Sequence, residues 1–231
     1  KYLKTPDKRE FRGQVDVTVA VGGGSFHGGI QFVSGHVATV PEFNYWGVAG
    51  SFQLPTAVPL GSTGLGLYGV NGGVAKGLIP TSVNLYEWNP SAGAGFAFQA
   101  GVTIGTYADT GYAFHAGVTM TVLVEPLIIR IDGTGNLLTK MSDISNVDRV
   151  VKASIVYDST TSTFEASLEL GQSDAQPFQL PHILSVRGMA VLHISDSMAY
   201  IHVGTKSNPV TARVFPDIGG GITASSWFMV D

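Results

Sequence analysis

The sequence contains no cysteine. This absence excludes disulfide bonds, metal sites built on thiolates and catalysis by a cysteine nucleophile. It leaves the cellular compartment open, because a protein without cysteine is compatible with both oxidising and reducing surroundings.

Charged side chains are scarce. They make up 13% of the 231 residues, and the net charge is −4, whereas an average soluble domain has about 25% charged residues. No basic cluster is present, which argues against a nucleic-acid partner. So low a charge has two interpretations: many strands are buried on both faces, or much of the surface meets something other than water.

Long apolar runs and helical periodicity are also missing. No window of 18 unbroken apolar residues occurs, so the sequence predicts no transmembrane helix. Apolar residues instead alternate with polar or small ones, as in the run of Val15, Val17, Val19 and Val21. This period of two predicts an all-β, antiparallel fold, either a sandwich or an open barrel-like wrap of roughly 12–14 strands, with under about 10% helix.

A near-duplicate stretch lies in the middle of the chain. The segment from Phe96 to Ile104 (FAFQAGVTI) recurs sixteen positions later as Tyr112 to Met120 (YAFHAGVTM). We expect residues 96–106 and 112–124 to form a hairpin that turns near Asp109. The apolar face should be the buried one, with Phe98, Val102, Phe114 and Val118 inside and Gln99 and His115 on the opposite face.

The chain divides weakly near its most polar stretch, residues 141–151. We expect a glycine- and aromatic-rich β region over 1–138 and a region of antiparallel hairpins over 139–231, or one continuous domain. The chain begins at Lys1 without a methionine and ends in the middle of a strand pattern. We therefore expect it to be a processed chain or a piece of a longer protein.

Three sets of residues could carry chemistry, and none predicts an enzyme. His193 and His202 would face each other across a tight hairpin, but no third ligand is evident, so we predict no metal and no cofactor. Asp132-Gly-Thr-Gly135 resembles the aspartic protease signature over four residues. That enzyme class needs a pair of such motifs, so we interpret the motif as a turn. Four aromatic residues are candidates for stacking on a ligand such as a sugar ring: Tyr45, Trp46, Tyr86 and Trp88.

A resemblance to a known family starts at Tyr200. The run from Tyr200 to Val210 (YIHVGTKSNPV), a following Gly-Ile, and Trp227-Phe-Met229 are similar to segments of very large, β-rich bacterial proteins that are secreted or surface-associated. The segment ending at Thr106 (FQAGVTIGT) is similar to their internal strands. Lys206 departs from the pattern, which has proline there. The resemblance covers about the last 130 residues and implies a bacterial, extracellular or cell-surface module with no catalytic residues to transfer.

Three classes of function remain. The first is a non-enzymatic structural or assembly module of a larger bacterial surface or secreted protein, which associates with itself or with neighbouring domains. The second is a carbohydrate- or ligand-binding β domain, with a glycan as partner. The third is a membrane β-barrel or pore segment. The sequence argues against a membrane, because Arg149, Glu165 and Glu169 belong to hairpins typical of soluble proteins, and because aromatic residues do not repeat at both ends of the strands.

Overall fold

The computed structural model describes residues 1–21, 24–139, 150–171, 177–180, 182–215 and 221–230. The fold is nearly all β, with 69% strand and 1% helix. This confirms the predicted all-β class and the low helix content.

The strands follow one another along the chain with short connections. They are β1 (Tyr2–Lys4), β2 (Lys8–Val21), β3 (Gly24–Val37), β4 (Phe43–Pro59), β5 (Leu65–Lys76), β6 (Leu78–Ile79), β7 (Asn89–Pro90), β8 (Phe96–Thr106), β9 (Phe114–Leu123), β10 (Ile128–Leu137), β11 (Val150–Asp158), β12 (Thr163–Leu170), β13 (Phe178–Leu180), β14 (Leu184–Ile194), β15 (Ala199–Val203), β16 (Val210–Val214), β17 (Ile222–Ser226) and β18 (Phe228–Val230). A short 3-10 helix, η1 (Leu85–Glu87), lies between β6 and β7.

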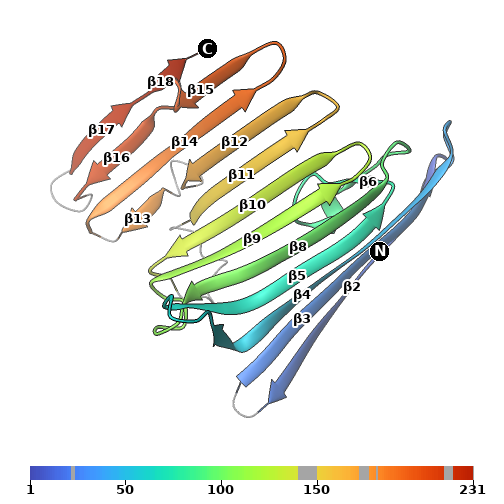
Figure 1. The fold of residues 1–231 in the computed structure, drawn as a ribbon, viewed down its shortest axis with the longest axis horizontal. Coiled ribbons are helices and arrows are strands. Elements are labelled where there is room, and N and C mark those ends of the chain that lie inside the picture. The colour runs from blue at the N-terminus through green and yellow to red at the C-terminus, as the bar shows by residue number, and fades with distance from the viewer. Residues whose placement is uncertain (22–23, 140–149, 172–176, 181, 216–220, 231) are drawn as a thin grey trace.

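One large antiparallel sheet contains 16 of these strands (Figure 1). Its order is β1-β2-β3-β4-β5-β8-β9-β10-β11-β12-β14-β15-β18, so nearly every strand pairs with its neighbours in the sequence. The sheet is open and does not close into a barrel. The observed architecture is thus a single curved meander, which is the open wrap of the two predicted arrangements.

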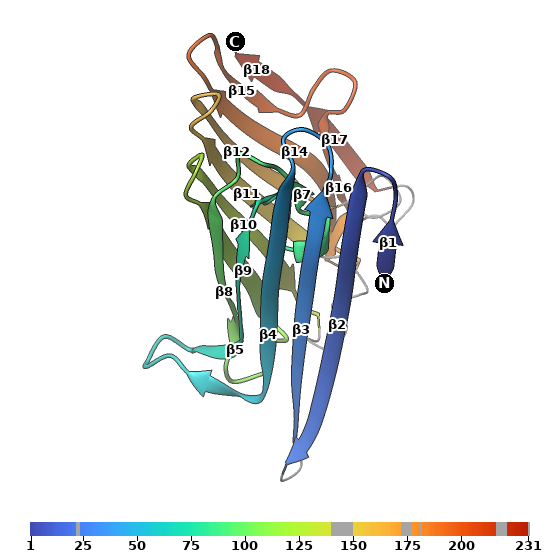
Figure 2. The same cartoon turned by 90° about the vertical axis from the view of Figure 1, so that its right-hand side faces the viewer.

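The sheet curves around the segment 77–95, which carries β6, η1 and β7 (Figure 2). Within this segment Leu78, Leu85 and Trp88 are buried, and they pack with Tyr45 and Leu123 of the sheet in one core cluster. The face that this segment covers is the inner, concave face of the sheet. The opposite, convex face has no such cover from the described residues.

The predicted hairpin is confirmed. β8 and β9 pair from Ala97↔Leu123 to Gly105↔His115. At the turn, the Asp109 carboxylate accepts hydrogen bonds from the backbone N–H groups of Tyr112 (3.1 Å) and Ala113 (2.8 Å). These bonds fix the turn where the sequence places it.

The turn predicted at Asp132-Gly-Thr-Gly135 is wrong. These residues lie inside β10, where Asp132 pairs with Thr119 on one side and Ser154 on the other. The Asp132 carboxylate accepts hydrogen bonds from Arg130 Nε (2.5 Å) and Ser154 Oγ (3.0 Å). A glycine-rich tetrapeptide can continue a strand when both neighbouring strands supply its backbone partners.

The sheet runs without a break across the predicted division at 138/139. β10 pairs with β11 from Ile128↔Asp158 to Asn136↔Val150. Residues 140–149, which hold most of the polar stretch and Arg149, lie outside the described residues. On the described residues the two regions share one sheet.

Glycine has a packing role at Gly35, which faces Tyr45 across β3 and β4. A Cβ atom on Gly35 would lie 2.1 Å from Tyr45 Cζ, and Tyr45 is 1% exposed. The ring therefore occupies the space that any other side chain at position 35 would need.

We predict that Gly35→Ala lowers the free energy of unfolding by about 1–3 kcal/mol, because the buried ring has no room to move. Urea denaturation followed by tyrosine fluorescence or circular dichroism measures the change. Gly50→Ala is the matched control, since its added Cβ meets nothing closer than Gly29 O at 3.5 Å. Equal stability of the two variants would contradict the packing role.

Candidate functional surface

The buried face of the central hairpin is the polar one, so the predicted face assignment is wrong. Phe98, Val102 and Val118 are 52%, 40% and 38% exposed, whereas Gln99 and His115 are 8% and 2% exposed. Phe114 is half-buried. The reason is the segment 77–95, which covers the face that carries Gln99.

The strand register shows that the apolar residues face outward across the whole sheet and not only in the central hairpin. Residues opposite each other on paired strands share a face, and three successive rows on the convex face contain only apolar residues and glycine. The first row is Val17, Gly28, Phe52, Val70, Val102, Val118, Gly133, Ala153, Leu168, Ala190, Val203 and Phe228; the second is Val15, Ile30, Gly50, Gly72, Ala100, Met120, Ile131, Ile155, Ala166, Leu192, Ile201 and Val230; the third is Gly13, Phe32, Val48, Val74, Phe98, Val122, Ile129, Tyr157, Phe164, Ile194 and Ala199.

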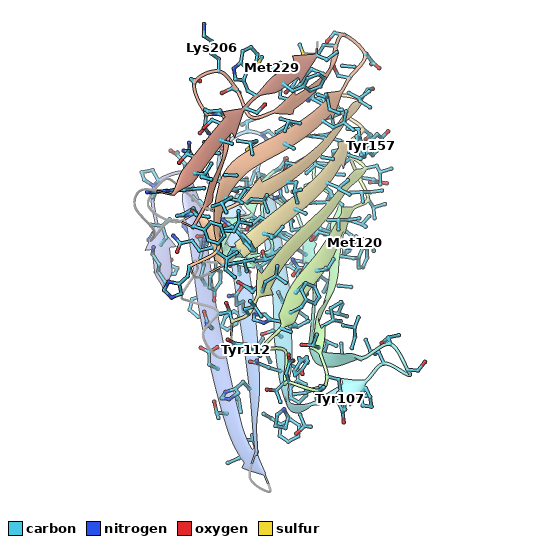
Figure 3. All side chains as sticks on the ribbon, turned by 90° about the vertical axis from the view of Figure 1, so that its left-hand side faces the viewer. Tyr107, Tyr112, Met120, Tyr157, Lys206 and Met229 are labelled. Atoms are coloured by element: carbon cyan, nitrogen blue, oxygen red, sulfur yellow. The ribbon has the colours of Figure 1, made fainter. Side chains whose placement is uncertain are left out.

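We call these three rows the apolar face. They cross twelve strands without a charged residue, and Tyr157 carries their one hydroxyl group. Figure 3 shows Met120 and Tyr157 on the same outer side of the sheet. At the β2–β5 end, Val17, Phe52 and Val70 line a shallow groove of about 570 Å³.

Aromatic residues and one cation border the apolar face. The next row contains Trp46, Lys76 and Phe96, which pair across β4, β5 and β8. Lys76 Nζ lies 5.3 Å from the centroid of the Phe96 ring, and the Trp46 and Phe96 rings meet edge to face at 6.4 Å. This border combines an apolar ring surface with a charge that can reach water.

The concave face holds a network of neutral polar side chains. Gln99 Nε2 donates to Val83 O (3.0 Å) and to Thr121 Oγ1 (3.4 Å), and Asn71 Nδ2 donates to Thr119 Oγ1 (3.2 Å). The first of these bonds ties β8 to the covering segment 77–95. Such groups tolerate burial because they have partners there.

A buried carboxylate, that of Glu10 on β2, lies on the concave face near the β2 edge of the sheet. Glu10 accepts hydrogen bonds from Arg12 Nε (2.5 Å) and the Tyr45 hydroxyl (2.7 Å), and Lys8 Nζ lies 2.8 Å away. Burial acts to raise the pKa of Glu10, but the three donors outweigh it and lower the pKa to about 2. Burial and the bond to Glu10 raise the pKa of Tyr45. Because its oxygens are engaged by these donors and its pKa is low, Glu10 is a poor general base.

The four aromatic residues predicted to stack on a ligand do not share a surface. Tyr45 and Trp88 are buried, and Trp88 Nε1 donates to Ser82 O (2.8 Å). Tyr86 is half-buried and bonds the backbone of Gly13 through its hydroxyl. Trp46 alone lies on the convex side, with 39% exposure.

His193 and His202 are offset from the predicted pairing, because the β14–β15 turn is centred one residue earlier than expected, with Ser195 N–H donating to Met198 O (2.8 Å). Tyr200 pairs with His193, and Val191 pairs with His202. The Tyr200 ring stacks between the two imidazoles, with centroid distances of 4.8 and 4.4 Å. Among the described residues, no group of three or more histidine, aspartate or glutamate residues could hold a metal ion.

One cleft was not predicted from the sequence. It has a volume of about 840 Å³ and lies beside the β8–β9 turn, where Tyr68, Tyr107 and Tyr112 line it together with Asp109. A hydrogen bond from Thr106 lowers the pKa of Asp109. The Asp109 carboxylate already accepts the hydrogen bonds that hold the β8–β9 turn. The cleft therefore presents tyrosine rings, and its one carboxylate is occupied.

The apolar face itself was missed because the sequence pattern was interpreted for a protein surrounded by water. A signal was present: between Arg12 and Arg130 the residues facing away from the apolar rows include glycine, threonine, glutamine and asparagine, and the only lysine, Lys76, lies on the other side. A face that meets water normally carries lysine and glutamate, so this composition indicates an interior.

Comparison with protein-family models, curated proteins and solved structures found no match to the chain. No helix among the described residues is long and apolar enough to cross a membrane.

We predict that Phe98→Ala lowers the free energy of unfolding in detergent-free buffer by less than about 1 kcal/mol, because half of the ring is already exposed. Leu123→Ala, on the covered face at 0% exposure, should cost about 2–5 kcal/mol. Paired urea denaturation curves measure both. A larger loss for Phe98→Ala than for Leu123→Ala would restore the original face assignment.

The Glu10 cluster predicts a dependence of stability on pH. The folded-state pKa of about 2 lies below the ordinary value of 4.5, so the contribution is present above pH 4.5 and lost as the pH falls from 5 towards 2. A single group shifted this far contributes about 3 kcal/mol. Thermal melts of Glu10→Gln between pH 2 and 7 should lose this part of the acid dependence. Glu42→Gln, at an exposed carboxylate, should keep it.

Proposed function

We propose that the chain is a non-enzymatic structural module of a larger β assembly. It acts by pairing its open sheet edges with another copy or with neighbouring parts of a longer chain. The supporting observation is the edge of β2, where residues 13–21 pair with β3 on one side and with no described strand on the other.

The edge of β2 can be followed through its backbone groups. Arg12 N–H donates to Lys1 O (2.9 Å), and the Lys1 ammonium donates to Arg12 O (2.7 Å), so Arg12 points its backbone groups away from β3. Backbone direction alternates along a strand, and the pairing of β2 with β3 continues from there without a bulge. Gln14, Asp16 and Thr18 therefore point their N–H and C=O groups at the same edge.

This edge has the features of a pairing surface. Among the described residues β1 and Lys1 cover this side of β2 from Arg9 to Arg12, and no strand covers residues 13–21 there. Residues 13–21 contain neither lysine nor proline, the residues that usually protect an exposed edge. A long edge without these protecting residues favours the addition of a strand.

The chemistry of the described residues supports the absence of catalysis. The buried carboxylate of Glu10 is engaged by its three donors, and Asp132 is held by Arg130 and Ser154. The resemblance to secreted and surface-associated bacterial proteins supports the same role outside the cell.

We predict that the chain forms oligomers in detergent-free buffer and that Thr18→Pro weakens their association about tenfold, since proline removes an edge donor and its ring obstructs an added strand. Light scattering over a concentration series measures this. Thr18→Ala is the control: it loses the same hydroxyl bond to His27 Nδ1 (3.1 Å) and keeps the backbone donor. A monomeric wild-type chain, or equal association of both variants, would contradict the proposal.

A further inference from the structure

We propose that the apolar face binds the acyl chains of a lipid bilayer. This inference rests on the proposed structural role and names the partner that covers the convex side of the module.

The chemistry of the face favours hydrocarbon over another protein. Twelve strands about 4.8 Å apart and three rows about 6.7 Å apart cover roughly 1,100 Å², beyond the roughly 300–600 Å² of the largest apolar patch on a typical monomer. A protein interface of that size would carry hydrogen bonds at about one per 100–200 Å². The three rows offer one hydroxyl, that of Tyr157, and otherwise no side-chain donor or acceptor.

The curvature of the sheet argues against a second copy as the cover. The segment 77–95 lies on the concave side, so the apolar face is convex (Figure 2). Two identical convex surfaces meet along a narrow line and leave most of the twelve strands uncovered. Acyl chains are fluid and follow a convex surface.

Strand length in the middle of the sheet fits the thickness of a bilayer, whereas β15 and β18 at one end have 5 and 3 residues. β8, β9, β10 and β14 have 11, 10, 10 and 11 residues, and a tilted strand needs about 9–11 residues to cross the hydrocarbon layer. The row of Trp46, Lys76 and Phe96 then lies at one border, where a tryptophan ring and a lysine that reaches water are typical anchors.

Glu165 and Glu169, whose charges argue against a membrane in the sequence, lie on the other face of the sheet. Glu165 pairs with His193 and Val156, and Glu169 pairs with Lys152 and Met189. All of these positions alternate with the apolar rows, so neither carboxylate interrupts the apolar face. Hydrocarbon cannot offer hydrogen-bond partners to the backbone groups of an open edge. The edge pairing proposed above gives these groups their partners.

Flotation of the 231-residue chain with phosphatidylcholine–phosphatidylglycerol vesicles tests the proposal. We expect the wild-type chain, diluted from urea, to float with the vesicles. Val102→Lys should lower the bound-to-free ratio about thirtyfold or more, the cost of a cation facing hydrocarbon. Thr103→Lys is the matched control, because the next residue of the same strand faces the polar side, and it should float like the wild type.

Quenching of tryptophan fluorescence by lipids brominated on their acyl chains adds a direct measure of contact. Trp46 lies on the convex side, while Trp88 is buried under the sheet at 3% exposure. We expect Trp46→Phe to lose a large part of the quenching seen for the wild type. Unchanged quenching in Trp46→Phe would overturn the proposal.

Two further outcomes would overturn the lipid inference and leave the structural role intact. One is a wild-type chain that forms oligomers sensitive to Thr18→Pro but does not float. The other is a detergent-free oligomer that Val102→Lys dissociates, which would assign the apolar face to another copy. A chain that floats and stays monomeric would support the lipid contact and contradict the assembly role.

Discussion

The packing of residues 77–95 against one face of the sheet is the contact on which the rest of the structure depends. Leu78 and Leu85 reach across to Gly47, where a Cβ atom would lie 3.3 and 2.8 Å from them. Arg12 donates to the carbonyl of Tyr86, which holds β2 to the same segment. Once one face of a strand is covered, alternation sends every second side chain outward. This single contact therefore decides that the polar rows are inside and the apolar rows outside.

Much of the fold could be predicted from the sequence, because strand alternation and turn residues are local signals. The β8–β9 hairpin and its turn at Asp109 are examples. The direction of the faces was predicted wrongly, because a period of two shows that the faces differ but not which one meets the core; only the composition of the polar rows indicates it. Longer-range detail was missed for a similar reason: the pairing of Tyr200 with His193 depends on where the β14–β15 turn is centred, and Asp132 remains in a strand because β9 and β11 flank it.

The open edge and the apolar face constrain each other. An edge that exposes backbone groups is compatible with water, and an apolar face is compatible with hydrocarbon, but a monomer in either solvent leaves one of them unsatisfied. Pairing at the edge satisfies the backbone and leaves the face for an apolar partner. The two proposals therefore belong together, because a partner at the edge and a partner on the face each satisfy only one of these surfaces.

The low charge of the chain now has a physical explanation. Of the two interpretations, burial of both faces of many strands does not fit, since the convex rows are exposed along β8 and β9. By register, Arg130, Asp132, Lys152, Glu165 and Glu169 all project from the concave side. The charge is thus not spread thinly over the surface. On β10, β11 and β12 it lies on the concave side. The convex side has no charge in its three central rows, and Lys76 lies in the row that borders them, so this side accounts for the deficit.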